Sequence, residues 1–146
     1  MRVDPKRTRR IFEKLLKVAP ELEGMRDHAV SKVPGVMDLS LDVLERSGRS
    51  MRIALAHYWR HPSGDLIADP DMEIAVFFDD QLAEALTYQD TFLYEAAYAE
   101  EGEPPDLQVH VRLNVFLEQW LDNLAAQGHL LTTERGGDLE YGRVSS

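Results

Sequence analysis

The fold is decided by residues 48–90, which read GRSMRIALAHYWRHPSGDLIADPDMEIAVFFDDQLAEALTYQD. Three runs in this stretch have the apolar, β-branched and aromatic content that is typical of strands. Residues with turn chemistry, mainly glycine, proline and paired aspartates, separate the runs. The stretch therefore predicts the centre of an antiparallel sheet.

The chain before this stretch predicts one more strand. Residues 26–34 show no clean period and are interpreted as a linker or a weak helical turn. After Gly35 the period becomes two, which is typical of a strand with one buried and one wet face. The apolar members of that alternation are Met37, Leu39, Leu41 and Val43. Residues 46–50 supply turn chemistry, so this strand and the next are predicted to form a hairpin. One face of the second strand is predicted to carry Met51, Ile53, Leu55, His57 and Trp59.

Later segments are predicted to extend the sheet. Residues 61–71 contain two prolines and are predicted to leave the ladder as a loop, so that pairing resumes at Met72. Asp79-Asp80 is predicted to turn the chain into a strand over 81–88. A further strand is expected over 92–98.

Helical signals lie on either side of the sheet. Asp4-Pro5 combines an N-cap residue with proline at the first helical position, so a helix is predicted over 5–18. Asp106 is the expected N-cap of a second helix, and Gly128 is its expected C-terminal stop. The apolar stripe of the second helix is Leu113, Phe116, Leu117, Trp120, Leu121 and Leu124. Its opposite side is predicted to carry Asn114, Glu118 and Asp122.

These elements together predict an α+β fold. The expected architecture is an antiparallel sheet of four to five strands, arranged as a meander of hairpins, with the N-terminal and C-terminal helices packed on one face. A chain of 146 residues fits one domain. That domain is predicted over 1–131, and residues 132–146 are predicted to be a frayed tail.

Composition excludes several classes of protein and site. The chain has no cysteine, which removes disulfides, thiolate zinc sites and cysteine nucleophiles. No apolar run approaches 18 residues, and no short apolar segment follows the basic N-terminus. Neither a membrane span nor a signal peptide is therefore predicted, and we expect a cytoplasmic protein.

The net charge of −10 hides an uneven distribution. Residues 1–17 carry seven Lys/Arg against two acidic residues, whereas residues 61–111 contain thirteen Asp/Glu and no Lys or Arg. A block of this kind sets up a field that repels phosphate backbones and attracts cations or a basic partner. Two plainer interpretations stay open. The block can be a solvated, solubilising surface, or the basic N-terminal helix can lie across it and neutralise it.

Common catalytic and binding motifs are missing. The sequence has no G-x-S-x-G elbow, Walker A loop, G-x-G-x-x-G or H-E-x-x-H. Asp65, Asp69 and Asp71 share one predicted loop, but they lack the spacing of a calcium-binding loop. No metal and no cofactor is therefore predicted.

One enzyme hypothesis remains, a carboxylate–histidine site made of His57, Asp80 and Glu84. It requires His57 and Asp80 to converge within hydrogen-bonding distance in a concave pocket. His57 and His61 stand four residues apart, which would align them on a helix. In a strand that runs into a turn, this spacing does not place the two side chains together. The alternative is that each histidine is structural and hydrogen-bonded.

Three blocks of the sequence resemble the YqiB-like family of bacterial proteins of unknown function, in matching order and spacing. They are LSLDVLERSG, DMEIAVFFDDQLAEALTYQD and LNVFLEQWLDNLAAQGH, and the likeness covers residues 10–129. The resemblance implies a single cytoplasmic domain and brings no established activity. Asp80 and Glu84 match the family pattern, but Asp79 replaces a typical histidine. Residues 105–110 also lack the family's polar run before the last helix, which weakens the enzyme hypothesis.

Three functions from different classes follow. The leading one is a protein-interaction or regulatory module that binds a basic protein partner, or a second copy of itself as a homodimer. An enzyme with the carboxylate–histidine site is second. Weak binding of nucleic acid or a membrane surface through the basic helix is third, and the acidity of the remaining chain makes nucleic acid an unlikely partner. The predicted interaction face is Asp65, Asp69, Asp71, Asp79, Asp80 and Glu84.

Overall fold

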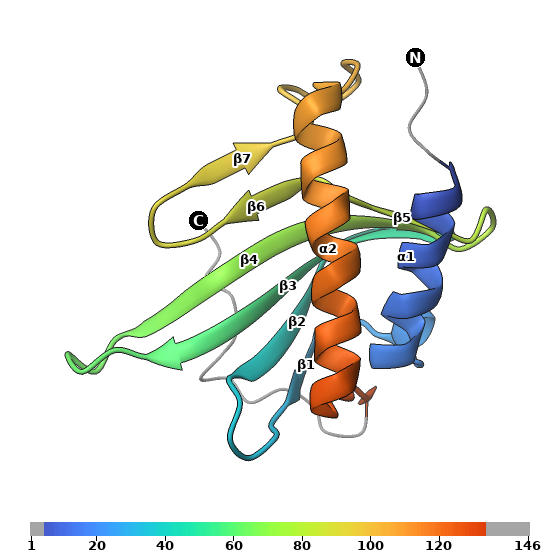
Figure 1. Ribbon diagram of the computed structural model, residues 1–146. Helices are drawn as coiled ribbons and strands as arrows, with labels where there is room; N and C mark the ends of the chain where they lie inside the picture. The colour runs from blue at the N-terminus through green and yellow to red at the C-terminus, as the bar shows by residue number, and fades with distance from the viewer. Residues whose placement is uncertain (1–4, 134–146) are drawn as a thin grey trace.

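Two helices lie side by side on one face of a seven-stranded antiparallel sheet in the computed structural model, which describes residues 5–133 (Figure 1). The predicted α+β class is thereby confirmed, with more strands than the four to five expected. The elements in chain order are α1 (Pro5–Val18), η1 (Leu22–Gly24), β1 (His28–Ser31), β2 (Asp38–Ser47), β3 (Ser50–Arg60), β4 (Leu66–Phe77), β5 (Leu82–Ala85), β6 (Thr87–Gln89), β7 (Tyr94–Ala96) and α2 (Leu107–Gln127). No helix among the described residues is both long and apolar enough to cross a membrane.

The sheet is organised around the long strand β4. Its strands run in the order β1-β2-β3-β4-β6-β7, and β5 pairs with β4 beside this path. The C-terminal half of β4 pairs with β5, while Asp71 in its N-terminal half pairs with Gln89 of β6. β5 and β6 thus pair one after the other along the same side of β4, with Leu86 between them. The strand predicted over 81–88 is therefore present but interrupted, and the one predicted over 92–98 shortens to β7.

The first strand replaces a predicted linker. β1 comes from the segment 26–34, for which no strand was expected, and pairs along its length with β2. Ala29 is buried opposite Leu41, whereas His28 Nδ1 donates a 2.6 Å hydrogen bond to the Asp42 carboxylate. Four residues are too few to show a period of two, which explains why sequence pattern missed this strand.

The β3–β4 ladder continues through the segment that was predicted to leave it. Pairing reaches Arg60 and Leu66, so β4 includes Asp69-Pro70. Ala56 pairs with Asp71 and Tyr58 pairs with Ala68, which leaves two residues of β4 opposite one residue of β3. This is a β-bulge, where proline is tolerated because the extra residue has no ladder bond to donate. The prediction that residues 61–71 leave the ladder is therefore wrong, because the bulge accommodates Pro70.

The core lies between the sheet and the helices. Ile11 and Leu15 of α1 and Leu117 and Leu121 of α2 are fully buried against the inward residues of the strands. Asp106 caps α2 as predicted, accepting hydrogen bonds from the backbone N–H groups of Gln108 and Val109. The stop at Gly128 is confirmed as well, since that residue has φ 91°, a left-handed conformation that glycine adopts without a steric cost.

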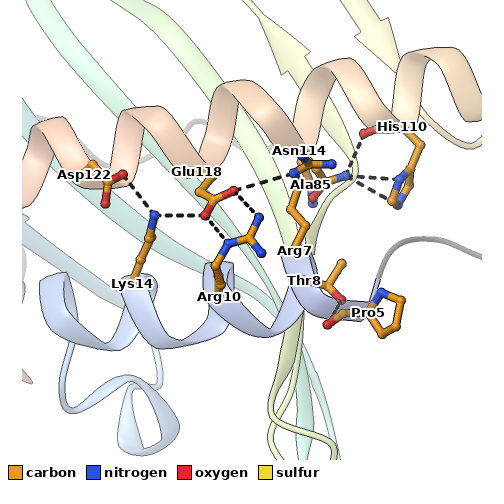
Figure 2. A network of polar contacts seen from close by, with 10 residues as sticks. All are labelled: Pro5, Arg7, Thr8, Arg10, Lys14, Ala85, His110, Asn114, Glu118 and Asp122. Atoms are coloured by element: carbon orange, nitrogen blue, oxygen red, sulfur yellow. Dashed lines mark hydrogen bonds and ion pairs between the residues drawn. The ribbon is translucent and has the colours of Figure 1, made fainter.

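Two of the polar residues predicted on the outer side of α2 lie inside the helix layer instead. Asn114 is 1% exposed, and Glu118 lies between the helices, where it accepts hydrogen bonds from Arg10 and Lys14 (Figure 2). Lys14 also bonds Asp122 at 3.0 Å. The Arg10 hydrogen bonds, with help from Lys14, lower the pKa of Glu118 to about 2. The prediction failed because α1 packs beside α2 and covers a side that an isolated helix would expose.

Two cations of the basic helix pair outside the acidic block. Arg10 and Lys14 bind carboxylates of α2 that lie outside residues 61–111. The predicted tail at 132–146 lies outside the described residues from 134 onward. Within them, Thr133 is held by hydrogen bonds to Glu21, and the Leu131 N–H donates to the Val18 carbonyl.

Candidate acidic cleft

The face of the sheet opposite the helices carries a cleft of about 680 Å³. Alternation along β4 shows how the strands build it. Met72, Ile74 and Val76 are buried toward the helices, so the residues between them, Glu73 and Ala75, point to the other face and line the cleft. Further walls come from β2, β3, β5, β7 and the segment that follows β7.

The cleft is strongly acidic. Among residues 5–133, Arg52 is the one Lys/Arg side chain in its lining. The Arg52 guanidinium donates a 2.8 Å hydrogen bond to Glu73 and lies 3.6 Å from a carboxylate oxygen of Glu45, so its charge is already engaged. The acidic lining residues are Glu45, Glu73, Glu84, Glu100, Glu101 and Glu103. The last three belong to the exposed loop before α2. From the described part of the chain, a ligand in this cleft meets a negative field and one arginine, which is already paired.

Apolar and aromatic groups share the lining with the carboxylates. Phe77 and Tyr94 are exposed large side chains at the cleft, and Leu86 and Ala96 add aliphatic surface. Ligand sites commonly combine apolar surface with a few placed polar groups. The cleft can therefore contact the aliphatic or aromatic part of a ligand as well as its charge.

A hydrogen-bonded network fixes Glu84 where β5, the segment after β7 and the start of α2 meet. Glu84 Oε1 accepts a 2.6 Å hydrogen bond from the Tyr98 hydroxyl and lies 2.9 Å from His110 Nε2. An ionised carboxylate only accepts, so Nε2 carries the hydrogen of this bond. Burial, followed by the hydrogen bond to Glu84, raises the pKa of Tyr98. The hydroxyl therefore stays a donor.

Asn114 supports this network from the helix side. Its Oδ1 accepts the Ala85 N–H at 2.8 Å, and its Nδ2 donates to the His110 carbonyl at 2.8 Å (Figure 2). Ala85 directly follows Glu84 in β5, on the opposite face of the strand. One buried amide thus fastens the outer edge of β5 to α2 and positions both Glu84 and His110.

The predicted enzyme residues do not come together. His57 lies on the helix-covered side, with its ring 5.4 Å from that of Trp120 and 5.9 Å from that of His129. Asp80 is exposed in the turn after Phe77. Phe77 pairs with Ser50, seven residues from His57 along β3, which is roughly 23 Å of strand. Glu84 has a histidine partner, but it is His110, which sequence reasoning missed.

The predicted interaction face is dispersed as well. Asp65 lies in the β3–β4 turn and Asp79 in the β4–β5 turn, separated by the length of β4, roughly 40 Å. Asp79 pairs with Arg49, and Asp69 accepts a hydrogen bond from Thr91. Asp71 lies on β4 near Asp69, and Asp80 lies next to Asp79. Of the six predicted residues, only Glu84 lines the cleft.

Within residues 5–133, no group of three or more His, Asp or Glu side chains is arranged to hold a metal ion. Buried histidines are present, and burial, followed by the neighbouring His129, lowers the pKa of His57 to about 4. Burial also lowers the pKa of His129, although the Met37 carbonyl and Asp38 oppose the shift.

The comparisons with known proteins give a family and nothing more specific. No curated protein and no solved structure matches the chain. A family model described as "Domain of unknown function (DUF6908)" matches residues 8–130. The sequence resemblance rightly pointed to a family of unknown function, but the matching model does not carry the YqiB name. The chain belongs to the DUF6908 family.

Proposed function

We propose that the protein is an interaction module whose acidic cleft binds a basic segment of a partner protein. The observation that carries this proposal is the lining of the cleft, six glutamates with one arginine that is already paired. Complementary charge steers association and selects partners by sign. The occupant that best fits this cleft is therefore an extended, lysine- or arginine-bearing peptide segment.

Size and lining support a peptide ligand. The volume of about 680 Å³ falls within the usual range of ligand sites, roughly 300–1,000 Å³. Phe77 and Tyr94 offer aromatic faces that can contact the aliphatic stem or the charge of a basic side chain. The loop before α2 exposes Glu100, Glu101 and Glu103. An approaching cation can therefore contact these carboxylates without first being buried.

The basic helix gives less support to a nucleic-acid or membrane ligand. Arg10 and Lys14 of α1 are ion-paired with Glu118, and Lys14 also with Asp122. Their charge is thus largely compensated within the helix layer. Phosphate binding depends on cations that are free to replace counterions, and the acidic cleft opposes an anionic ligand on the other face.

The proposal is tested with a fluorescently labelled basic peptide and fluorescence anisotropy at two salt concentrations. In the cleft variant Glu100, Glu101 and Glu103 are changed together to Gln. In the control variant Asp65, Asp79 and Asp80 are changed together to Asn, which removes the same charge at exposed turns outside the cleft.

We expect the peptide to bind the wild type and to lose affinity with rising salt. The cleft variant should bind at least tenfold more weakly, whereas the control variant should change less than threefold. Equal losses in the two variants would mean that only net charge matters. That result, or the absence of salt-dependent binding, contradicts the proposal.

A further inference from the structure

Only one of the two carboxylate oxygens of Glu84, a cleft-lining residue, is engaged by partners among residues 5–133. Oε1 is shared by two donors, the Tyr98 hydroxyl at 2.6 Å and His110 Nε2 at 2.9 Å. A carboxylate oxygen has about two lone-pair sites, so these bonds fill the capacity of Oε1. Oε2 makes no hydrogen bond or ion pair with any residue in 5–133. It is the acceptor that remains for a ligand.

The two donors are held in place from behind. His110 is 3% exposed, and Asn114 contacts its ring from the next turn of α2 (Figure 2). The Tyr98 ring packs edge-on against the His110 ring, with centroids 6.2 Å apart at 89°. Neither donor can leave Oε1 without disturbing buried packing. The asymmetry of the Glu84 carboxylate is therefore built into the fold.

This asymmetry discriminates between the two basic side chains. Arginine binds carboxylates best through a bidentate pair that uses both oxygens. On Glu84 it keeps one bond and loses the parallel two-oxygen geometry, because its second arm finds no acceptor on the same carboxylate. A lysine ammonium is a point charge that needs only one oxygen here, and its other hydrogens can turn to neighbouring carboxylates. We propose that Glu84 makes the cleft select a lysine side chain over an arginine side chain.

This inference rests on the proposed function and goes further by naming the side chain that the site prefers. Its test uses two labelled peptides that are identical except that every lysine of one is arginine in the other. Anisotropy titrations give the ratio of their dissociation constants. The wild-type protein should bind the lysine peptide at least fivefold more tightly.

Tyr98→Phe is the decisive variant, because it removes one donor from Oε1 and frees a lone pair for the second arm of a guanidinium. We expect the arginine peptide to gain affinity and the ratio to fall toward one. Tyr88→Phe is the matched control, since the Tyr88 hydroxyl bonds Asp90 outside the cleft lining. It should leave the ratio at its wild-type value. Glu84→Gln should weaken the lysine peptide and also abolish the preference.

Urea denaturation of each variant confirms that it is folded before binding is measured. Equal affinities of the two peptides for the wild type, or a ratio that Tyr98→Phe does not change, overturn the lysine preference. The proposed function survives those results if the Glu100, Glu101 and Glu103 variant still weakens both peptides. Failure of both peptides to bind overturns both proposals together.

Discussion

The two faces of the sheet are built from the same strands and have opposite character. Along β4, Met72, Ile74 and Val76 are fully buried beneath the helices, while Glu73 and Ala75 between them line the acidic cleft. Because side chains alternate along a strand, one residue of β4 packs in the core and the next faces the cleft. Changes on the helix-covered face should alter stability, and changes on the cleft face should alter binding with little effect on stability.

The largest expected effect is that of Trp120→Ala on the helix-covered face. Trp120 is 5% exposed and packs between His57 and Phe116. Its loss should lower the free energy of unfolding by about 3–5 kcal/mol. Phe77→Ala on the cleft face is the comparison, because Phe77 is 36% exposed and should cost less than about 1 kcal/mol. Urea denaturation measures both changes. Similar losses of unfolding free energy in the two variants would contradict the predicted difference between the faces.

An intermediate effect is expected where the two faces are joined. Asn114→Leu keeps the approximate size of the side chain but leaves the buried Ala85 N–H without its acceptor. The cost should be about 1–3 kcal/mol, the penalty of an unsatisfied buried donor. Asn123→Leu makes the same chemical change at an exposed position of α2 and should stay within about 0.5 kcal/mol. Urea denaturation of both variants measures these losses, and an equal loss in the two variants would contradict the prediction.

A smaller, pH-dependent effect should belong to the helix-covered face alone. The pKa of His57 is lowered to about 4, chiefly by burial, from its ordinary value of 6.5. The unfolded chain therefore binds a proton before the folded one does, and stability present above pH 6.5 should be lost as the pH falls toward 4. Glu118, with its pKa lowered to about 2, stabilises the fold above pH 4.5, and its contribution should be lost only as the pH falls from 4.5 toward 2.

Urea titrations at pH 7.5, 6, 5 and 4.5 measure this loss. His57→Phe keeps an aromatic ring beside Trp120 but cannot be protonated, so it should flatten the dependence. His61→Phe, in the exposed β3–β4 turn, leaves the buried histidines in place and should behave as the wild type does. A wild-type slope in the His57→Phe protein would assign the acid sensitivity to other groups.

The helices and the central hairpin were predictable because their signals are local. Asp4-Pro5 and the apolar spacing that follows predicted α1 over the residues it occupies, and Asp106 and Gly128 predicted the limits of α2. The β2–β3 hairpin was predicted from alternation and from the turn at Gly48. Failures arose where tertiary contacts decide, as at the bulge that admits Pro70 and at Asn114, which α1 and β5 bury.

The sequence predicts that this region is acidic, but it does not predict which residues line the cleft. The absence of Lys and Arg over 61–111 correctly indicated an acidic region. Of the residues predicted for an interaction face, only Glu84 lines the cleft, because β4 carries Asp65 and Asp79 to opposite ends of the sheet. Glu84 and His110 are 26 residues apart, one on a strand and one on a helix. No sequence period connects such a pair, so only the folded backbone brings them together.

Contacts between the end of α1 and the chain after α2 join two segments that are synthesised far apart in time. Thr133 bonds Glu21 across 112 residues, and Leu131 bonds Val18. A nascent chain therefore exposes α1 and the apolar face of the sheet until α2 and these contacts have left the ribosome. Pairing at such sequence separation is slow, and uncovered apolar surface favours aggregation and chaperone binding. The helix layer therefore cannot close fully before residues 131–133 have been synthesised.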